Sequence, residues 1–403
     1  MPVGEMNAAC YRDITIEGFR GIRGLTLEGC GPLNLLVGGN NSGKTSVLEA
    51  LLLLTDPMNV DQWEAAVELR RSWPFVDDRF RTDGMDRLDA LSWLFPHVAG
   101  EPGLLRLCAT GGGSTTSVEA SIERIVGTPP RRPIMDDAEL IEGGAYSVGV
   151  GHLREEPEPY PTDGLVIDMK VAVPRAGIDS SASSPQPFRM VLWGSGRGSR
   201  RRVRKPSGPA CPSAFATPIS HRSDGYLTSR VGRLIRAKTK DEAVALLQML
   251  DKKLWDLVVV TPEEPDEPRG SFPRRGRAAT LHVEHADAGL VPIHVLGDGT
   301  RRAIHFATLV TELGEGGLLL IDEIESGIHT AVLRGVFSWL ARACRDRGVQ
   351  MFATTHSLEA VDSLLEAVPD REVVLYRLKN GEARRYDGDL LRIARFEMGQ
   401  EVR

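Results

Sequence analysis

Residues 36–50, LVGGNNSGKTSVLEA, have the spacing of a phosphate-binding loop. Gly38, Gly43, Lys44 and Thr45 satisfy the pattern G-x-x-x-x-G-K-[ST], between an apolar run of strand character and one of helix character. In such a loop, glycine lets successive backbone N–H groups converge on phosphate oxygens at the positive end of a helix. The lysine then reaches the β and γ phosphates, and the threonine hydroxyl binds Mg²⁺. We therefore expect ATP and Mg²⁺ to bind here; the alternative is a glycine-rich turn before a buried helix. The expected contacts with the nucleotide are Gly38, Asn40, Asn41, Ser42, Gly43, Lys44, Thr45 and Ser46.

An acidic pair follows a second apolar run, in the stretch GLLLIDEIESG. An acid at the carboxyl end of a buried strand is costly without a cation, and magnesium beside ATP supplies one. Asp322 is the candidate for second-shell or water-mediated magnesium binding, and Glu323 for the base that orients the attacking water. Any strand that leads into a polar loop has a similar pattern, so the assignment depends on the phosphate-binding loop that precedes it.

The stretch MFATTHS ends a further apolar run in Thr355, His356 and Ser357. We expect this strand to lie beside the strand of the acidic pair, where the His356 imidazole would bond to the γ phosphate. The alternative is a histidine that only packs or lies at the surface.

Gly297, Asp298 and Gly299 precede a helix that the sequence predicts from Thr300. The start of a helix with bare amides is an anion site. Because the first loop already holds one set of phosphates, we expect this second site to serve a nucleotide held by another subunit. The alternative is an ordinary glycine turn in which Asp298 or Thr300 caps the helix.

The N-terminal elements that must position the loop can be predicted from the apolar pattern. Alternating apolar and polar residues in 13–19 and 24–29 predict strands, and the continuous run LNLLV predicts a strand buried on both faces. The run SVLEALLLL predicts a helix deep within the fold. Between residues 102 and 223, segments rich in Gly, Ser and Pro interrupt short alternating runs, which indicates an inserted β-rich region.

From about residue 225 onward, predicted strands and helices alternate, which is the α/β pattern of a largely parallel sheet. The predicted helices are 226–237, 239–257 with a capping box of Thr239 and Glu242, one from Thr300, 331–343, and one from Ser357. The predicted strands are 281–285, 292–296, 317–322, 349–355 and 372–378.

The composition of the 403 residues, 41% hydrophobic and 26% charged, is that of a globular protein. The sequence has no apolar run near the eighteen or so residues that span a bilayer, and we expect a cytoplasmic location without membrane partners. The five cysteines have no metal-site or disulfide spacing. The net charge of −6 does not indicate nucleic-acid binding by the chain as a whole, so such binding could come only from two local basic patches, the runs 197–205 and 273–277. The alternative is that these two runs are solvated loops.

Taken in order, GGNNSGKTS, LGDGTRR, LLLIDEIESG and TTHS resemble the Walker A, signature, Walker B and switch-histidine motifs of ABC-type ATPases. Within these, the chain resembles the OLD-like (overcoming lysogenisation defect) branch, which is related to RecF and SMC proteins and also has a sequence like FRGI, residues 19–22. The resemblance covers residues 11–100 and 225–403, with 101–224 as the inserted β-rich region. It implies an α/β fold, a P-loop NTPase of ABC-ATPase type with a mixed sheet.

This resemblance also implies a homodimer or higher homo-oligomer that closes around ATP. Gly297, Asp298 and Gly299 would act on the nucleotide of the other subunit, Arg20 would contact phosphate or adenine, and 326–329 would face the dimer partner. Two departures from the family are that Gly297 replaces the usual signature serine, and that Gln62 is poorly placed for a Q-loop glutamine. The Toprim nuclease of larger OLD relatives has no counterpart, since the Asp-Gly-Asp at 387–389 is better explained by Asp389 capping a helix.

Three functions remain open at this point. The first is a Mg²⁺-dependent ATPase switch that controls a separately encoded effector, in defence against phage. The second is a RecF-like ATP-dependent clamp that binds DNA for repair. The third is the ATPase of a membrane transporter, which the unassigned Q-loop and the large insertion disfavour.

Overall fold

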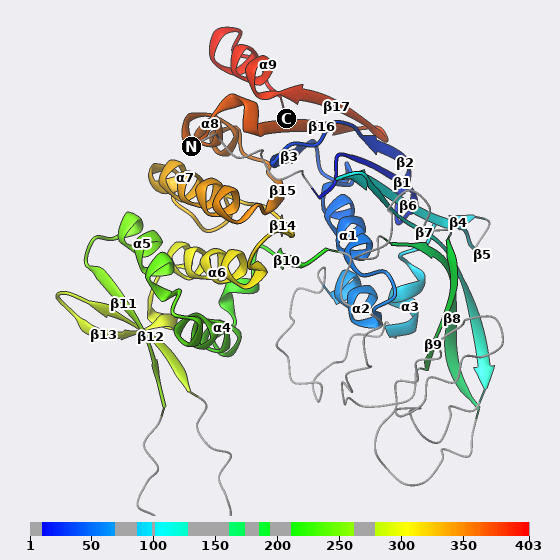
Figure 1. Cartoon of the computed structure of the whole chain (residues 1–403), viewed down its shortest axis with the longest axis horizontal. Helices are drawn as coiled ribbons and strands as arrows, with labels where there is room; N and C mark the ends of the chain where they lie inside the picture. Colours follow the sequence, from blue (N-terminus) through cyan, green and yellow to red (C-terminus); the bar gives the residue numbers. More distant parts are fainter. Residues whose placement is uncertain are drawn as a thin grey trace, which may run out of the picture. The chain divides into compact units, whose positions relative to one another are not determined.

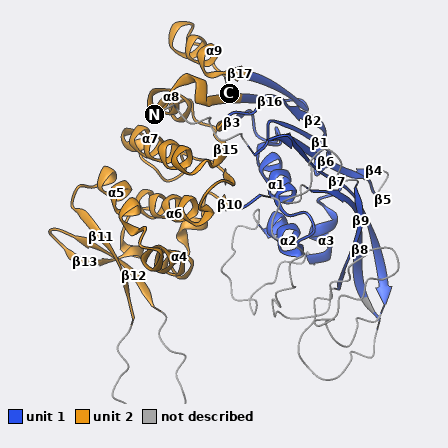
Figure 2. Ribbon diagram, viewed as in Figure 1, with its two compact units in different colours: residues 1–31, 36–213, 376–385 blue, residues 32–35, 214–375, 386–403 orange. Residues whose placement is uncertain are grey.

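A computed structural model describes residues 10–68, 87–98, 101–127, 161–173, 185–193, 211–261 and 279–402. The chain divides into two compact units (Figure 2). Unit 1 contains residues 1–31, 36–213 and 376–385, and unit 2 contains residues 32–35, 214–375 and 386–403. The basic runs 197–205 and 273–277 lie outside the described residues. The boundaries 11–100, 101–224 and 225–403 of the ATPase segments and the insertion remain predictions.

Unit 1 contains a six-stranded antiparallel sheet in the order β2-β1-β6-β7-β8-β9 (Figure 1). Its strands are β1 (Asp13–Phe19), β2 (Ile22–Leu27), β6 (Leu105–Gly111), β7 (Ser114–Gly127), β8 (Thr162–Ala172) and β9 (Gln186–Trp193). Side chains of β1 alternate between the two faces of this sheet: Ile14 and Ile16 are buried on one face, whereas Glu17 on the other face is exposed. On the exposed side, Arg106 lies opposite Glu119 and Asp168 lies opposite Arg189, so opposite charges pair across the strands.

Helix α1 (Lys44–Thr55) packs against this sheet and contacts β1, β6 and β7. Every residue from Ser46 to Thr55 is buried, because the helix also packs against α2 (Val60–Glu68). The prediction of a deeply buried helix is confirmed. The remaining short elements of unit 1 are α3 (Arg87–Ser92), β4 (His97–Val98) and β5 (Glu101–Pro102).

The second six-stranded sheet has the order β10-β14-β15-β3-β16-β17 (Figure 1). Its strands are β3 (Leu33–Val37), β10 (Ser213–Ala216), β14 (Leu318–Ile321), β15 (Gln350–Thr354), β16 (Val373–Lys379) and β17 (Glu382–Asp387). All residues of β3, β14 and β15 are buried, as the continuous apolar runs predict for strands covered on both faces. Strands β14 and β15 run parallel, and a two-residue turn joins β16 to β17. The predicted α/β P-loop fold with a mixed sheet is confirmed.

Helices of unit 2 cover this sheet, with α6 contacting β14 and α7 contacting β15. The helices are α4 (Asp224–Ala237), α5 (Lys240–Leu250), α6 (Asp298–Leu313), α7 (Thr330–Arg347), α8 (Leu358–Ala367) and α9 (Gly388–Arg392), the last continued by a π-helical turn (Ile393–Glu397). Helix α7 ends at Gly348, a left-handed C-cap with a φ of 64°. A three-stranded antiparallel sheet packs on α4 and α5, formed by β11 (Leu254–Val260), β12 (Thr280–His285) and β13 (Gly289–Pro292).

Three sequence predictions about unit 2 are wrong. The helix predicted over 239–257 ends at Leu250, because Leu254–Val260 pairs with β12 as a strand. The predicted capping box does not form, since Thr239 makes no side-chain cap bond. The strand predicted over 292–296 is instead a 3₁₀ turn, Ile293–Val295, after Pro292.

Among the described residues, none of the helices has the length and apolar character needed to cross a bilayer. All five cysteines are free thiols, and Cys30, Cys211 and Cys344 are buried. Burial raises the pKa of Cys30 to about 11 and that of Cys344 to about 12.

Candidate functional site

The P-loop connects β3 to α1 and lies in unit 1. Three residues have positive φ, namely Gly38 (148°), Asn41 (62°) and Gly43 (93°). A Cβ on Gly38 would collide with the carbonyl oxygen of Leu378 and lie 2.8 Å from Ser42 Oγ. Glycine at position 38 is therefore required both by the backbone conformation and by the close approach of β16.

The polar groups of the loop fit a phosphate ligand. Lys44 is buried, and its Nζ donates to the carbonyl oxygens of Gly38 at 2.8 Å and Gly39 at 3.0 Å. Ser42 Oγ is buried without a hydrogen-bond partner among the described residues. Helix α1 begins after Gly43 with no side-chain cap, so its first N–H groups face the loop. An unsatisfied hydroxyl, uncapped amides and a lysine folded onto the loop are the groups that triphosphate oxygens bind.

The other predicted nucleotide contacts in unit 1 have different environments. Asn40 and Asn41 are exposed, Thr45 is half-buried in the first turn of α1, and Ser46 is buried. Arg20 has a φ of 51°, and its guanidinium pairs with the buried carboxylate of Glu49 at 2.7 Å. It also donates to the carbonyl oxygen of Ala66 at 3.0 Å. Arg20 thus joins the strand turn before the loop to α1 and α2, and its contact with a nucleotide stays a prediction.

The acidic pair lies in unit 2, directly after β14. Glu323 has a left-handed main chain with a φ of 48°, which is rare for a residue with a long side chain. The hydroxyl of Thr354 donates to Asp322 Oδ1 at 2.6 Å and accepts from the Glu323 N–H at 2.8 Å. One threonine of the neighbouring strand therefore fixes both the Asp322 carboxylate and the Glu323 backbone.

Arg302 of α6 secures the same two residues from the other side. Its side chain is fully buried and donates to the carbonyl oxygens of Thr217 at 2.9 Å, Asp322 at 3.0 Å and Glu323 at 2.6 Å. Burial lowers the pKa of Arg302 to about 10, and the nearby carboxylates of Glu325, Glu323 and Asp322 oppose that decrease. The guanidinium is therefore charged at neutral pH, and it compensates the acidic end of β14 in place of a carboxylate partner.

The predicted signature residues lie at the start of α6. The helix begins at Asp298 with Gly297 as N-cap, two residues earlier than the predicted start at Thr300. Asp298 does not cap the helix but pairs with Arg222 at 2.6 Å and with His221 at 3.4 Å. A Cβ on Gly299 would lie 3.0 Å from the carbonyl oxygen of Gly327, so the loop 326–329 packs closely against the helix start.

His356 follows β15, with an exposed imidazole that makes no hydrogen bond within the described part of the chain. Its backbone N–H donates to Glu325 Oε1 at 3.1 Å, which ties the histidine to the loop after the acidic pair. Ser357 caps α8 by accepting from the Ala360 N–H. Within unit 2, Arg302 and Thr354 thus join Asp322 and Glu323 in one hydrogen-bonded network. Asp298 bonds to Arg222 and His221, and His356 bonds to Glu325, outside this network.

Two residues of this network, Arg302 and Thr354, are missing from the sequence prediction. Arg302 shares a helix face with Phe306, Leu309 and Leu313, all buried. A charged residue on an apolar helix face was the signal that could have identified it. Thr354 was assigned only to a buried strand, and nothing in its spacing distinguishes a hydroxyl that bonds from one that packs.

Comparison with known proteins places the chain among P-loop ATPases. Residues 199–362 match the family model described as "AAA domain, putative AbiEii toxin, Type IV TA system", and residues 13–57 match a second AAA-domain model. Two similar solved structures are an SMC head bound to the C-terminal winged-helix domain of ScpA and an ATP-bound RecF. The first has a TM-score of 0.44 at 12% identity and covers 94% of this chain and 98% of that one. The second has a TM-score of 0.43 at 12% identity and covers 96% of this chain and 100% of that one.

A curated relative, "Uncharacterized protein MJECL11" from Methanocaldococcus jannaschii, is 34% identical over 90 residues, which make up 22% of this chain and 78% of the relative. The chain therefore belongs to the same family as MJECL11, and it contains an ATPase domain of the AAA type.

Proposed function

We propose that this protein is an ATP-hydrolysing switch that dimerises around nucleotide and controls a separate effector. The left-handed main chain of Glu323 is the observation that carries the hydrolytic role. A non-glycine residue in this conformation costs on the order of 1 kcal/mol or more and persists only when its surroundings fix it. Here Thr354 and Arg302 supply those bonds. Strain fixed in this way beside an acidic strand end is typical of a catalytic position.

In this proposal the P-loop holds the triphosphate through its amides, Ser42 and Lys44. Lys44 would exchange its bonds to the Gly38 and Gly39 carbonyl oxygens for bonds to phosphate oxygens. Thr45 would bind Mg²⁺ and Asp322 would act on the ion from the second shell or through water, and Mg²⁺ would supply neutralisation of the phosphate charge. Glu323 then orients the attacking water as a base, and His356 bonds to the γ phosphate.

The dimer assignment rests on the start of α6. Gly297 and Gly299 present bare backbone at a helix N-terminus, and Asp298 remains part-exposed while paired with Arg222. We propose that these three residues meet the nucleotide of the second subunit, as in the OLD-like, RecF and SMC proteins that the motifs resemble. Arg302 connects this helix to Glu323, so signature contact and hydrolysis would be coupled.

The effector assignment is supported by the description of the matching family model, which names the AbiEii toxin and a type IV toxin–antitoxin system. A toxin system needs a control element, and an ATPase that opens and closes is suited to that role. We therefore propose a place in defence against phage, within the OLD-like branch.

Replacement of Glu323 by Gln tests the hydrolytic role. The variant should bind ATP as tightly as the parent chain, lower turnover by roughly 10²–10⁴ and accumulate as an ATP-bound dimer. Phosphate release measures turnover, nucleotide titration measures ATP affinity, and light scattering after size exclusion measures the amount of dimer. Glu315→Gln changes an exposed carboxylate of the same unit and serves as the matched control. Unchanged turnover in Glu323→Gln would refute the assignment.

A further inference from the structure

The helical segment 388–397 carries large apolar side chains on its exposed side. It consists of α9 and the π-helical turn that continues it, drawn in red in Figure 1, and it belongs to unit 2. The exposed fractions are 47% for Leu390, 41% for Ile393 and 46% for Phe396. Exposed apolar residues that are scattered singly are ordinary, but a local concentration of them marks a surface that another molecule covers.

The opposite side of this segment is fixed to the rest of unit 2. Leu391 is fully buried, and a Cβ on Gly388 would collide with the carbonyl oxygen of Asp370, so the backbones approach closely there. The Nε atom of Arg392 donates to the two carboxylate oxygens of Asp370, at 2.8 and 2.6 Å. These contacts determine which side of the segment is left in water.

A second arginine holds the far end of the segment. Nε and Nη2 of Arg395 donate to the two carboxylate oxygens of Asp362 in α8, each at 2.8 Å. The ring of Phe396 in turn lies over the Arg392 guanidinium, with its centroid 5.6 Å from Cζ, which is a cation–π contact. The exposed apolar side is therefore ordered before any partner binds, which lowers the entropic cost of docking.

Two carboxylates stand on the exposed side beside the apolar residues. Asp389 and Glu397 are exposed, and neither forms an ion pair within the part of the chain that the structure describes. Residues four apart on a helix are neighbours, so Ile393 lies between the two acids. Arg392 attracts Asp389 only at longer range, because its guanidinium is bonded to Asp370. The exposed side thus combines apolar surface with negative charge.

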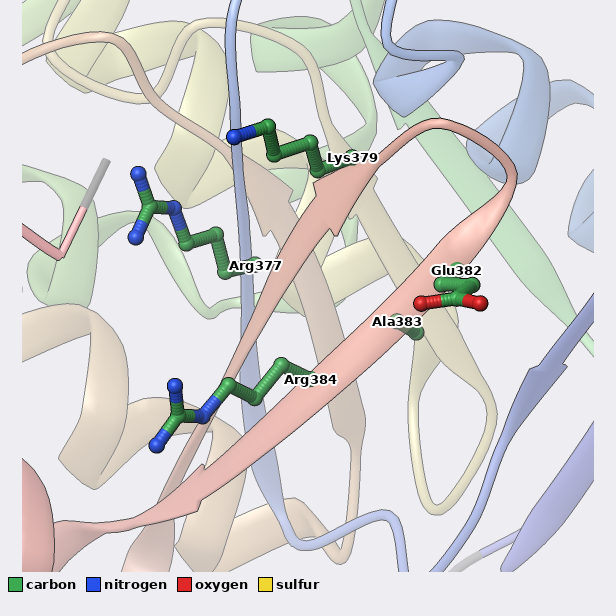
Figure 3. A pocket seen from close by; sticks show the side chains of 5 residues that line it. All are labelled: Arg377, Lys379, Glu382, Ala383 and Arg384. Carbon is green, nitrogen blue, oxygen red and sulfur yellow. The ribbon is translucent and has the colours of Figure 1, made fainter.

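The hairpin of β16 and β17 offers no comparable surface. Its hollow of about 300 Å³ is lined by Arg377, Lys379, Glu382, Ala383 and Arg384 (Figure 3). Lys379 stands opposite Glu382 across the two-residue turn, and Arg384 also has an interaction partner. The hairpin therefore presents charge with little apolar surface, and the helical segment is the better place for an apolar partner.

We propose that the exposed side of 388–397 docks an amphipathic helix of a second protein. The apolar face of that helix would cover Leu390, Ile393 and Phe396, and its lysines or arginines would pair with Asp389 and Glu397. Only the identification of this second protein with the effector rests on the proposed function, because the docking surface itself does not depend on nucleotide.

The charges argue against two other occupants. A second copy of this chain in a two-fold symmetric contact would bring Asp389 and Glu397 against the same acids, which repel each other. A membrane surface that contains anionic lipids would repel them as well. A basic helix is the occupant that complements both the apolar residues and the acids.

The experiment titrates the full chain, without nucleotide, into a labelled peptide of about five helical turns that has leucines on one face and lysines at its borders. One comparison peptide has glutamate in place of lysine, and another has the same composition with the leucines scattered. The apolar variant carries Leu390→Gln and Ile393→Gln. Its matched control carries Ile235→Gln and Met249→Gln, two exposed apolar residues of the same unit. Thermal melting checks that all variants fold.

The parent chain should bind the lysine peptide at least about tenfold more tightly than either comparison peptide, and the apolar variant should lose at least about tenfold in affinity. The control should stay within about twofold of the parent. A further variant, Asp389→Asn with Glu397→Gln, should weaken binding of the lysine peptide and remove most of its salt dependence.

Four results would overturn the proposal. They are absence of lysine-peptide binding by the parent, equal losses in the apolar variant and the control, self-association of the nucleotide-free parent that the apolar variant abolishes, and binding to phosphatidylserine vesicles that it abolishes. The outcome is separable from the switch itself. A parent that binds the peptide while Glu323→Gln traps no dimer retains the docking surface and loses the switch, and the reverse result does the opposite.

Discussion

The Nη2 atom of Arg302 lies 2.6 Å from the main-chain carbonyl oxygen of Glu323. This bond connects the helix that begins with the signature residues to the residue proposed as the hydrolytic base. It also means that a charge with no carboxylate bonded to it is buried in unit 2, held by three carbonyl oxygens.

Arg302→Gln should lower the free energy of unfolding by about 3 kcal/mol, because it leaves buried carbonyl oxygens unsatisfied and the acids near β14 uncompensated. Urea denaturation measures the change. Arg342→Gln, on the exposed side of α7, should change the free energy of unfolding by less than about 0.5 kcal/mol. Similar values for the two variants would contradict the role given to Arg302.

Thr354→Val should lower kcat by roughly 10 to 100 while leaving ATP affinity close to that of the parent chain. Valine has nearly the same shape but removes the hydroxyl that orients Asp322 and the Glu323 backbone. Steady-state kinetics and nucleotide titration separate the two effects. Thr354→Ser retains the hydroxyl and should restore turnover, whereas a serine variant as impaired as the valine one would show that only packing matters.

Gly38→Ala should abolish nucleotide binding and destabilise unit 1 by roughly 2 kcal/mol or more, since the new Cβ collides with the Leu378 carbonyl oxygen at a positive φ. The neighbouring Gly39 offers a matched comparison, because a Cβ there meets no atom within 4 Å. Gly39→Ala should therefore fold as the parent does. Titration with a fluorescent nucleotide and thermal melting check both variants, and equal tolerance at the two positions would contradict the loop geometry.

Burial, together with the charge of Arg302, lowers the pKa of His221 to about 4, so this histidine is neutral in the folded protein. The unfolded chain takes up a proton near its ordinary pKa of about 6.5, and the folded one does so only near pH 4. The contribution of His221 to the free energy of unfolding is therefore fully present above pH 6.5. It is lost as the pH falls towards 4, by on the order of 2 kcal/mol. His221→Gln should flatten the dependence of unfolding free energy on pH in this window.

The control for that measurement is His294→Gln, which replaces an exposed histidine of the same unit. It should leave the pH profile as it is in the parent chain. If the pH profile of His221→Gln superimposes on the profiles of the parent chain and of His294→Gln, His221 is not held neutral in the folded protein.

The sequence predicted the elements whose signals are local and strong. Continuous apolar runs located β3, β14 and β15, and the spacing of the P-loop placed Lys44 at the start of a buried helix. It also placed Asp322 and Glu323 directly after a buried strand. Their joint action on one nucleotide stays a prediction.

What the sequence could not predict depends on pairing between distant segments. The predicted helix over 239–257 includes the first four residues of β11 (Leu254–Val260), but pairing with β12 makes this segment a strand, which its valines also favour. The cap of α9 is Asp387, whose carboxylate accepts from the Leu390 N–H, and not Asp389 as predicted. Aspartate is a favourable N-cap residue at either position, and only the residue at which β17 ends and the helix begins determines which of the two is the cap. Likewise, the bonds of Arg302 require the 217–222 segment and the β14 end to meet at α6.

Strand β17 lies at the end of its sheet, where one row of backbone N–H and C=O groups has no neighbour among the strands that the structure describes. Such an edge invites strand addition by another chain, and charged side chains are a common protection against it. The exposed Arg384 and Arg385 of the β16–β17 hairpin therefore protect against intermolecular β-pairing. A version of this protein with a neutral, apolar hairpin would be expected to aggregate, even if every residue of its ATPase motifs were unchanged.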